Sequence, residues 1–398
     1  MVAKYSQFYF TKEDPDYSNK GSRDPLAFQV LWQHQGKKLI PFLSTVSVNL
    51  NDFQILCLAY YFYGKDPDNS FVRFFIRFEQ LMAYVRFEPL NGGGFNGVDR
   101  IRKKLLENPN KVSISNTPAD EILSNQRAYG IWGKYNRPFN DIGFTTIPDF
   151  QNIFNEKVEN LKDVVAIRKI INSIITKPES NFKLVDIQCM KALLEFTDNE
   201  RVFYCDAILK VNANNTFQNE LFQFVSAQSL PKDLELYNFL HLFAKSLNSK
   251  NEVLKNILEE IEFTEKILCP LNQIFRYIQT KPIWEKKEIL EDPYINQCKK
   301  PLDYVFVGGN EHCKIKNQLA KLFYKNNWNL IEDLAIRNKE ETEKRDGGPW
   351  ITITKDIIEV HHADGGFPNP DFDPKRNYAN AYFIDTYLRL YRQATSSI

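Results

Sequence analysis

The chain has 398 residues, with 51 Lys and Arg against 50 Asp and Glu, so its formal net charge at pH 7 is +1. Apolar residues make up 43% of the chain and charged residues 25%, which is typical of a globular protein. This composition excludes a disordered chain, a collagen-like or coiled-coil rod, a membrane-embedded protein and a strongly basic nucleic-acid coat. The length predicts two or three domains.

Cysteine usage and the N-terminal residues predict a cytoplasmic protein. The six cysteines are scattered singly and form no CxxC pair, which is typical of buried thiols in a reducing compartment. The first residues reach Lys12, Glu13 and Asp14 before any apolar stretch long enough for a signal peptide. The longest nearly apolar run, 55–63, is less than half of a membrane-spanning helix, so no membrane association is expected.

Residues 1–147 are predicted to form a first domain of helices and loops. The clearest helix covers about 70–87, where apolar residues recur at three- and four-residue steps and Ser70 is the expected N-cap. Further helices are expected at 51–63 and 98–107. Aromatic residues, 14% of the chain, are expected mainly in cores, with base-stacking or protein-binding surfaces as alternatives.

Residues 148–300 predict a second domain, a helical bundle or array in which strand signals almost vanish. Apolar stripes within 161–175 and 253–261 indicate two of its helices. Proline lacks a backbone N–H and clashes with the preceding turn, so the prolines here are expected to separate helices. These breakers are Pro178, Pro231, Pro270, Pro282 and Pro293.

Residues 301–398 predict a third domain, a C-terminal α+β module. Helices are expected at about 313–325, 328–345 and 377–394, with a β-hairpin formed by 350–354 and 357–361 around the Lys355-Asp356 turn. Helix, helix, hairpin is the order of a winged-helix module, and also of many small α+β units that bind nothing. The predicted fold class is therefore mainly α, multi-helical, with a C-terminal α+β module containing a β-hairpin.

Two groups of basic residues are the candidate nucleic-acid-binding sites. Arg100, Arg102, Lys103 and Lys104 share the helix expected at 98–107. Arg127, Lys134 and Arg137 alternate with aromatic residues that could stack on bases, namely Tyr129, Trp132 and Tyr135. The alternative for this second segment is that Gly130 and Gly133 allow a bent helix to pack closely on the core.

No motif supports a catalytic, cofactor or metal site. Residues 92–97 match GxGxxG but follow a helix instead of a strand, so they are interpreted as a connector. His312, Cys313, His361 and His362 are the only cluster of nitrogen and sulfur ligands, with His34 and His241 alone, and adjacent histidines on a strand point to opposite faces. The E-x-K spacing of a nuclease at Glu285-Lys286-Lys287 falls in a region expected to be helical.

Four segments together resemble an uncharacterised bacterial family: 24–32 (DPLAFQVLW), 39–46 (LIPFLSTV), 126–133 (QRAYGIWG) and 348–350 (GPW). Members of that family accompany helicases, nucleases or ATPases in phage-defence gene clusters. The resemblance implies a role beside nucleic-acid enzymes and carries over no catalytic residue.

The leading hypothesis is a non-catalytic subunit of a bacterial multi-protein complex that acts on or senses DNA or RNA, plausible in defence against phage, with a helicase, ATPase or nuclease as partner. One alternative is a metal-dependent nuclease or hydrolase that uses His312, His361 and Asp364 near the C-terminus. Another is a pure protein scaffold without nucleic-acid affinity.

Overall fold

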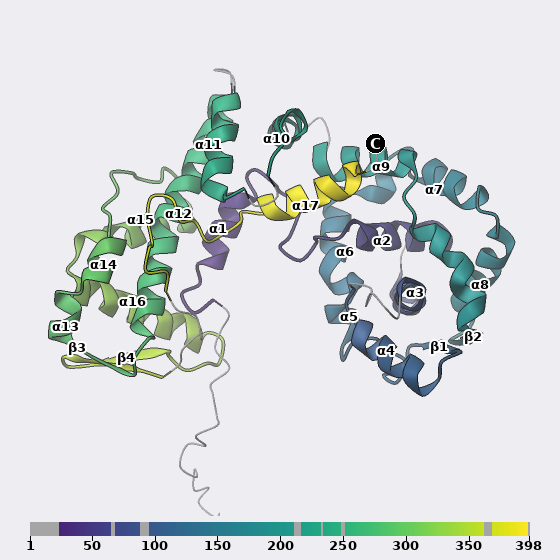
Figure 1. Ribbon diagram of the computed structural model, residues 1–398, viewed down its shortest axis with the longest axis horizontal. Helices are drawn as coiled ribbons and strands as arrows, with labels where there is room; N and C mark the ends of the chain where they lie inside the picture. The colour runs from purple at the N-terminus through teal and green to yellow at the C-terminus, as the bar shows by residue number, and fades with distance from the viewer. Residues whose placement is uncertain are drawn as a thin grey trace, which may run out of the picture. The chain divides into compact units, whose positions relative to one another are not determined.

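A computed structural model describes residues 24–64, 68–87, 95–210, 216–231, 234–247, 251–361 and 368–396 (Figure 1). Within these residues the protein is mainly helical, with seventeen α-helices and five short strands, all paired antiparallel. The predicted fold class is confirmed. Gly92, Gly93, Gly94, His362 and Asp364 lie outside the described residues. Every helix inside them is too short or too polar to serve as a transmembrane span.

The chain forms two compact units. Unit 1 combines Met1–Leu39 with Ser229–Tyr382, and unit 2 combines Ile40–Gln228 with Phe383–Ile398. These units divide the chain differently from the predicted domains 1–147, 148–300 and 301–398. Residues far apart in sequence complete each unit, and local periodicity carries no signal for such a return of the chain.

Unit 1 is built around one long buried helix. Its elements are α1 (Gln29–Gly36), α11 (Leu236–Ser246), α12 (Glu252–Ile278), β3 (Ile283–Glu285), α13 (Lys286–Leu290), α14 (Pro293–Cys298), α15 (Glu311–Lys321), the 3₁₀ turn η4 (Leu322–Tyr324), α16 (Asn327–Glu343), β4 (Ile351–Thr354) and β5 (Ile357–Val360). Helix α12 packs against α1, α11, α14 and α15.

The prediction that Pro270 breaks a helix is wrong. Pro270 lies inside α12 and is buried there, between Cys269 and Leu271. A proline inside a helix costs a hydrogen bond and crowds the preceding turn. The buried residues along 27 helical positions offset that cost, since tertiary packing supplies most of a helix's stability. Pro293, by contrast, occupies the first turn of α14, where its missing N–H costs nothing.

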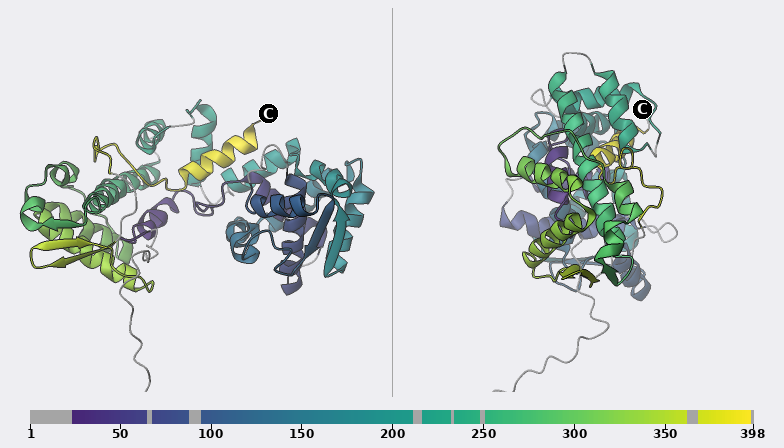
Figure 2. Two further views of the ribbon diagram at one scale, coloured as in Figure 1. Left: turned by 60° about the horizontal axis from the view of Figure 1, so that its bottom comes forward. Right: turned by 90° about the vertical axis from the view of Figure 1, so that its left-hand side faces the viewer.

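The predicted C-terminal hairpin is confirmed and is part of a larger sheet. Strand β5 pairs with β4 on one side and with β3 on the other, in the order β3-β5-β4. The hairpin of β4 and β5 is the yellow-green pair of arrows at the left of the first view in Figure 2. The region around Glu285 was expected to be helical, and this expectation is wrong for 283–285. Backbone pairing with β5 explains the strand, and Trp284 anchors it, because its ring is buried and its indole N–H donates to the Ile278 carbonyl at 2.7 Å.

The helix that precedes the hairpin bears on the winged-helix alternative. In such modules this helix enters the DNA groove. The exposed face of α16 instead carries Glu332, Glu340 and Glu343 with only Lys339 as a cation. A duplex would meet net negative charge on this face, so α16 is poorly suited to contact phosphates.

Unit 2 is helical with one two-stranded sheet. Its elements are α2 (Leu50–Tyr63), α3 (Asn69–Arg86), α4 (Val98–Glu107), β1 (Lys111–Ser115), α5 (Gln126–Tyr129), α6 (Ile131–Ile142), η1 (Phe144–Thr146), α7 (Phe150–Glu159), α8 (Val164–Thr176), β2 (Glu179–Lys183), η2 (Leu184–Leu194), α9 (Asp198–Tyr204), the π-helical η3 (Cys205–Lys210), α10 (Thr216–Ala227) and α17 (Ile384–Thr395).

Helix α3 runs through the middle of unit 2, among α2, α6, α8 and β1 (Figure 1). The expected amphipathic helix is therefore confirmed, although its N-cap is Asp68 and not Ser70. The Asp68 carboxylate accepts from the backbone N–H groups of Ser70 and Phe71 at 2.9 and 3.0 Å. Much of the surrounding core is aromatic, as expected from the composition. Its fully buried rings include Phe53, Phe71, Phe74, Phe75, Phe78, Phe139 and Phe144.

The other predicted helices agree to varying degrees. Helix 98–107 is found with these bounds as α4, and 51–63 is α2 with one further residue. The C-terminal helix predicted from 377 begins only at Ile384. Its N-cap, Phe383, and the preceding Tyr382 both have positive φ, so the backbone there is not yet helical.

Candidate functional site

The four basic residues of α4 differ in how accessible they are. Arg102 and Lys103 are exposed, and Arg102 forms an ion pair with Asp99 at 2.6 Å. Arg100 is half-buried and donates from Nη1 to the Glu121 carbonyl at 3.1 Å. A phosphate could reach Arg102 and Lys103 without displacing a tertiary contact.

Lys104 lies on the inward side of α4. Its Nζ atom is buried and has no hydrogen-bond partner within the described residues. Burial lowers the pKa of Lys104, while Asp120 nearby partly opposes that effect. The structure therefore separates Lys104 from the two exposed cations of the same helix.

Much of the segment 127–137 packs against the core, which was the alternative to nucleic-acid contact in the sequence analysis. Tyr135 is buried and its hydroxyl accepts from the Asn49 backbone N–H at 3.0 Å, and the Trp132 ring lies 5.6 Å from that of Phe75. A Cβ atom at Gly133 would lie 1.9 Å from the Ala128 carbonyl oxygen, so the close approach requires glycine.

The basic residues of that segment still point to solvent in part. Arg127 and Arg137 are exposed and Lys134 is half-buried. Arg137 makes only a loose ion pair with Asp141, at 3.7 Å between two exposed side chains. Of the three interleaved aromatic rings, only Tyr129 is largely exposed, at 61%.

Two further lysines lie opposite each other at one end of the β1–β2 sheet. Lys111 and Lys183 are register partners in this antiparallel pair, so their side chains leave the sheet on the same face. Both are exposed, and neither has an ion-pair partner in the part of the chain that the structure describes. Like charges directly opposite each other destabilise a sheet, and an anion bound between them would remove the repulsion.

A groove of about 660 Å³ runs past these two lysines. We call it the strand-end groove; it is lined by Asn108, Pro109, Asn110, Lys111, Asn181, Phe182, Lys183 and Asp186. The side chains of Asn108 and Asn110 make no hydrogen bond within the described residues, and both residues line the groove beside the two lysines. Two cations and two side-chain amides are groups that bind the phosphates of a nucleic-acid chain.

Sequence reasoning missed Lys183 and did not select Lys111 as a site residue. They are separated by 72 positions, and β2, with the sequence ESNFK, has no strong strand pattern. Only the pairing with β1 brings the two lysines together. Of the two lysines, only Lys111 belongs to the stretch of chain that leads out of α4 into β1.

The C-terminal histidine and cysteine residues do not form a metal centre within the described residues, which hold no group of three or more ligands suited to a metal ion. The ring of His312 lies against that of His34, with centroids 4.2 Å apart and the ring planes tilted by 35°, so the expectation that His34 stands alone is wrong. The ring of His361 instead lies 2.7 Å from the Thr352 hydroxyl, through Nε2. Burial and the adjacent His312 lower the pKa of His34.

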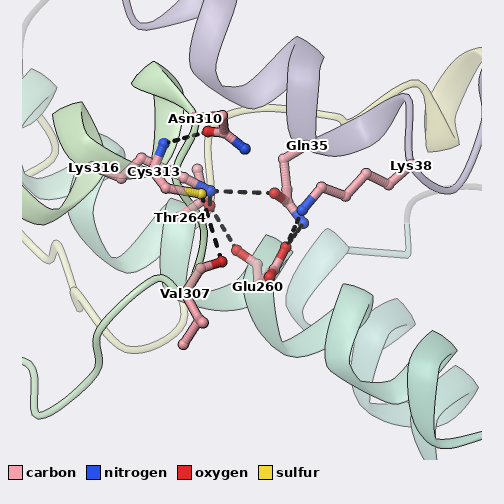
Figure 3. Close-up of polar contacts among 8 residues, drawn as sticks. All are labelled: Gln35, Lys38, Glu260, Thr264, Val307, Asn310, Cys313 and Lys316. Atoms are coloured by element: carbon pink, nitrogen blue, oxygen red, sulfur yellow. Dashed lines mark hydrogen bonds and ion pairs between the residues drawn. The ribbon is translucent and has the colours of Figure 1, made fainter.

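Cys313, next to His312, belongs to a buried polar cluster in unit 1 (Figure 3). The Lys316 ammonium, on the same helix, donates to the side-chain amide oxygen of Gln35 at 3.2 Å and to the Thr264 hydroxyl at 3.4 Å. It also lies 3.8 Å from the centre of the Phe306 ring. Glu260 accepts from Gln35 at 2.7 Å and from Lys38.

This cluster joins α1, α12 and α15 through one buried ammonium. Lys316 is 1% exposed, and burial lowers its pKa to about 8, although Cys313 and Glu260 favour its charged form. A lysine with such a pKa is a good nucleophile when a substrate can reach it. Lys316 and Cys313 are both enclosed, so the cluster acts in packing the three helices together.

Comparison of the chain with protein-family models, with characterised proteins and with solved structures found no match.

Proposed function

We propose that the protein is a cytoplasmic, non-catalytic nucleic-acid-binding subunit, and that the strand-end groove of unit 2 contacts the phosphate backbone. The observation that carries the proposal is the cross-strand pair of Lys111 and Lys183, two exposed cations on one face with no anionic partner within the described residues. Binding a phosphate chain requires cations that converge, and a basic average is not enough. This pair meets that requirement in a chain whose net charge is only +1.

The exposed cations of α4 extend this surface along the chain. Arg102 and Lys103 precede the groove by a few residues, and α4 leads directly into the turn that supplies Asn108 and Asn110. Single-stranded nucleic acid suits the site best, because none of the residues that line the groove belongs to an element that would enter a duplex groove. The resemblance to a phage-defence family supports the wider role beside a helicase, ATPase or nuclease.

The test is fluorescence anisotropy with a labelled single-stranded DNA or RNA of about 20 nucleotides, titrated between about 50 and 200 mM salt. Changing Lys111 and Lys183 together to Ala is expected to weaken binding about tenfold at low salt. The slope of log affinity against log salt should fall by about 1.4, because two phosphate contacts are lost at about 0.7 each for a single strand.

A matched control changes Lys314 and Lys321 to Ala, which removes two exposed lysines of α15 in unit 1. This variant has the same net charge as the double variant of the groove and should bind like the wild type. If both variants lose affinity equally, binding reflects net charge alone. If neither changes, the groove does not contact nucleic acid and the proposal fails.

A tagged pull-down from the native host tests the wider role. Co-purification of a helicase, ATPase or nuclease in stoichiometric amount would support the subunit assignment, and elution of the protein alone would refute it.

A further inference from the structure

A second cleft in unit 2, of about 870 Å³, has the opposite charge. It lies between η1, α7, α9 and η3, and its volume is in the range of ligand-binding clefts, about 300–1,000 Å³. Three carboxylates line it, those of Asp149, Glu156 and Asp206, against the single cation Lys210. We call it the acidic cleft.

Two of these carboxylates lack a cation. Lys210 is engaged by Asp206, with 2.7 Å between Nζ and Oδ1, one turn apart on η3. Asp149 and Glu156 have no ion-pair partner within the described residues, and Glu156 accepts only from the Asn199 amide, at 3.0 Å. The cleft therefore presents two uncompensated negative charges, which repel nucleic acid and attract a cationic group.

The negative surface continues past Glu156. A smaller pocket of about 280 Å³ shares Ile153, Glu156 and Asn199 with the cleft, so the two adjoin, and it adds the exposed Glu195. Lys157 also lines this pocket, but its ammonium is buried and paired with Glu200. It therefore compensates little of the charge at the surface.

Apolar side chains lie between the charges. Val202 on α9 is 52% exposed although it lines the cleft, and Ile147 and Ile153 beside it are half-buried. An aliphatic side chain on the cleft wall gives the stem of a lysine or arginine an apolar surface on which to lie. The wall also includes the π-helical η3, and π-helical segments occur often at functional sites.

We propose that the acidic cleft binds an extended, Lys- or Arg-bearing peptide segment of a partner protein. Its cationic ends pair with Asp149 and Glu156, and its aliphatic stems cover Val202. The side-chain amides of Asn152, Asn199 and Asn219 line the same cleft and can bond a peptide backbone through both donor and acceptor atoms. A polyamine has no carbonyl group to accept from these amides, so the amides favour a peptide.

The probe is a fluorescein-labelled hexapeptide, acetyl-Lys-Val-Arg-Lys-Val-Lys-amide, titrated with the full chain and followed by anisotropy. Wild type should bind it, and affinity should fall as salt rises. Changing Asp149→Asn and Glu156→Gln together is expected to weaken binding about tenfold, since two charge pairs are lost at the surface. Val202→Lys should weaken it further by placing a cation in the cleft.

The controls separate this site from net charge and from the strand-end groove. Asp163→Asn with Glu107→Gln changes the same charge at exposed positions outside the cleft and should leave peptide binding unchanged. The variant of Lys111 and Lys183 should also bind the peptide like wild type. In turn, the variant of Asp149 and Glu156 should keep its affinity for nucleic acid, so the two proposals can fail independently.

Three outcomes would overturn the inference. The first is no binding of the hexapeptide by wild type at millimolar concentration. The second is equal affinity for a peptide with Glu in place of each Lys and Arg, or equal affinity in the Asp149 and Glu156 variant. The third is displacement of the peptide by spermidine at equal concentration, which would make a polyamine the occupant.

Discussion

Replacing Glu79 with glutamine is expected to change the stability of unit 2 by an amount that depends on pH. Glu79 lies on α3 and is 1% exposed. Its carboxylate accepts from the Ile131 backbone N–H, at the start of α6, at 2.6 Å, and from the Gln126 amide at 3.0 Å. Arg86 and Asp52 form an ion pair at 2.7 Å and are the charged groups that act on the pKa of Glu79: Arg86 lowers it and Asp52 raises it.

Burial raises the pKa of Glu79 from 4.5 to about 7, although the hydrogen bonds from Gln126 and Ile131 oppose the rise. The folded state therefore holds a proton between pH 4.5 and 7 that the unfolded state has released, so stability falls as pH rises through this window. A rise of this size in the pKa corresponds to about 3 kcal/mol of folding stability, which is lost as the pH rises from 4.5 through 7.

Urea denaturation of wild type and Glu79→Gln, followed by far-ultraviolet circular dichroism at several pH values from 4 to 8, measures this effect. Glutamine has the shape of the protonated carboxyl and no charge to lose. The free energy of unfolding of the variant minus that of wild type should rise by about 3 kcal/mol between pH 4.5 and 7. A difference that stays constant over this range would refute the assignment of a protonated Glu79.

Three further variants test buried charges, and a fourth, at an exposed ion pair, serves as a control. Lys104→Met should raise the free energy of unfolding by about 1 kcal/mol, because it removes a buried ammonium that has no hydrogen-bond partner within the described residues. The variant should keep its nucleic-acid affinity, and a lower free energy of unfolding would contradict the prediction. Glu200→Gln should cost about 3–5 kcal/mol in urea denaturation, since the buried Lys157 loses its charged partner, whereas Asp206→Asn in the exposed pair with Lys210 should cost less than about 1 kcal/mol. With the pKa of Lys316 lowered to about 8, wild type should gain stability relative to Lys316→Met as pH rises from 8 to 10.5, where only the unfolded chain holds the extra proton; a flat difference would contradict it.

The variants of Lys104 and of the Lys111–Lys183 pair also separate two kinds of basic residue. Lys104 was a candidate site residue because it adjoins Arg102 and Lys103 in the sequence. Its position on α4 points the side chain inward. The ammonium group is buried, so a phosphate cannot reach it. Sequence proximity therefore selected one residue that the fold removes from the surface.

Local patterns in the sequence predicted eight of the seventeen α-helices within the described residues. Helix 98–107, predicted directly after the glycine-rich segment 92–97, was found with the predicted bounds. The hairpin at 351–360 followed in the same way from two β-branched runs around a two-residue turn. The aromatic composition likewise indicated an aromatic core, which unit 2 contains.

What the sequence could not determine depends on residues that are distant in the chain. Strand β3 exists because β5 pairs with it, and Pro270 stays helical because α12 is buried around it. The contact between the rings of His34 and His312 also arises from long-range packing.

The two candidate binding surfaces arise in the same way. The lysine pair at 111 and 183 needs a strand register, and the acidic cleft needs α7, α9 and η3 side by side. Helix and strand propensities depend on a few neighbouring residues. A binding site forms only when distant segments of the unit pack together. For this protein the sequence alone determined the helical class, and the tertiary structure decided which charges converge.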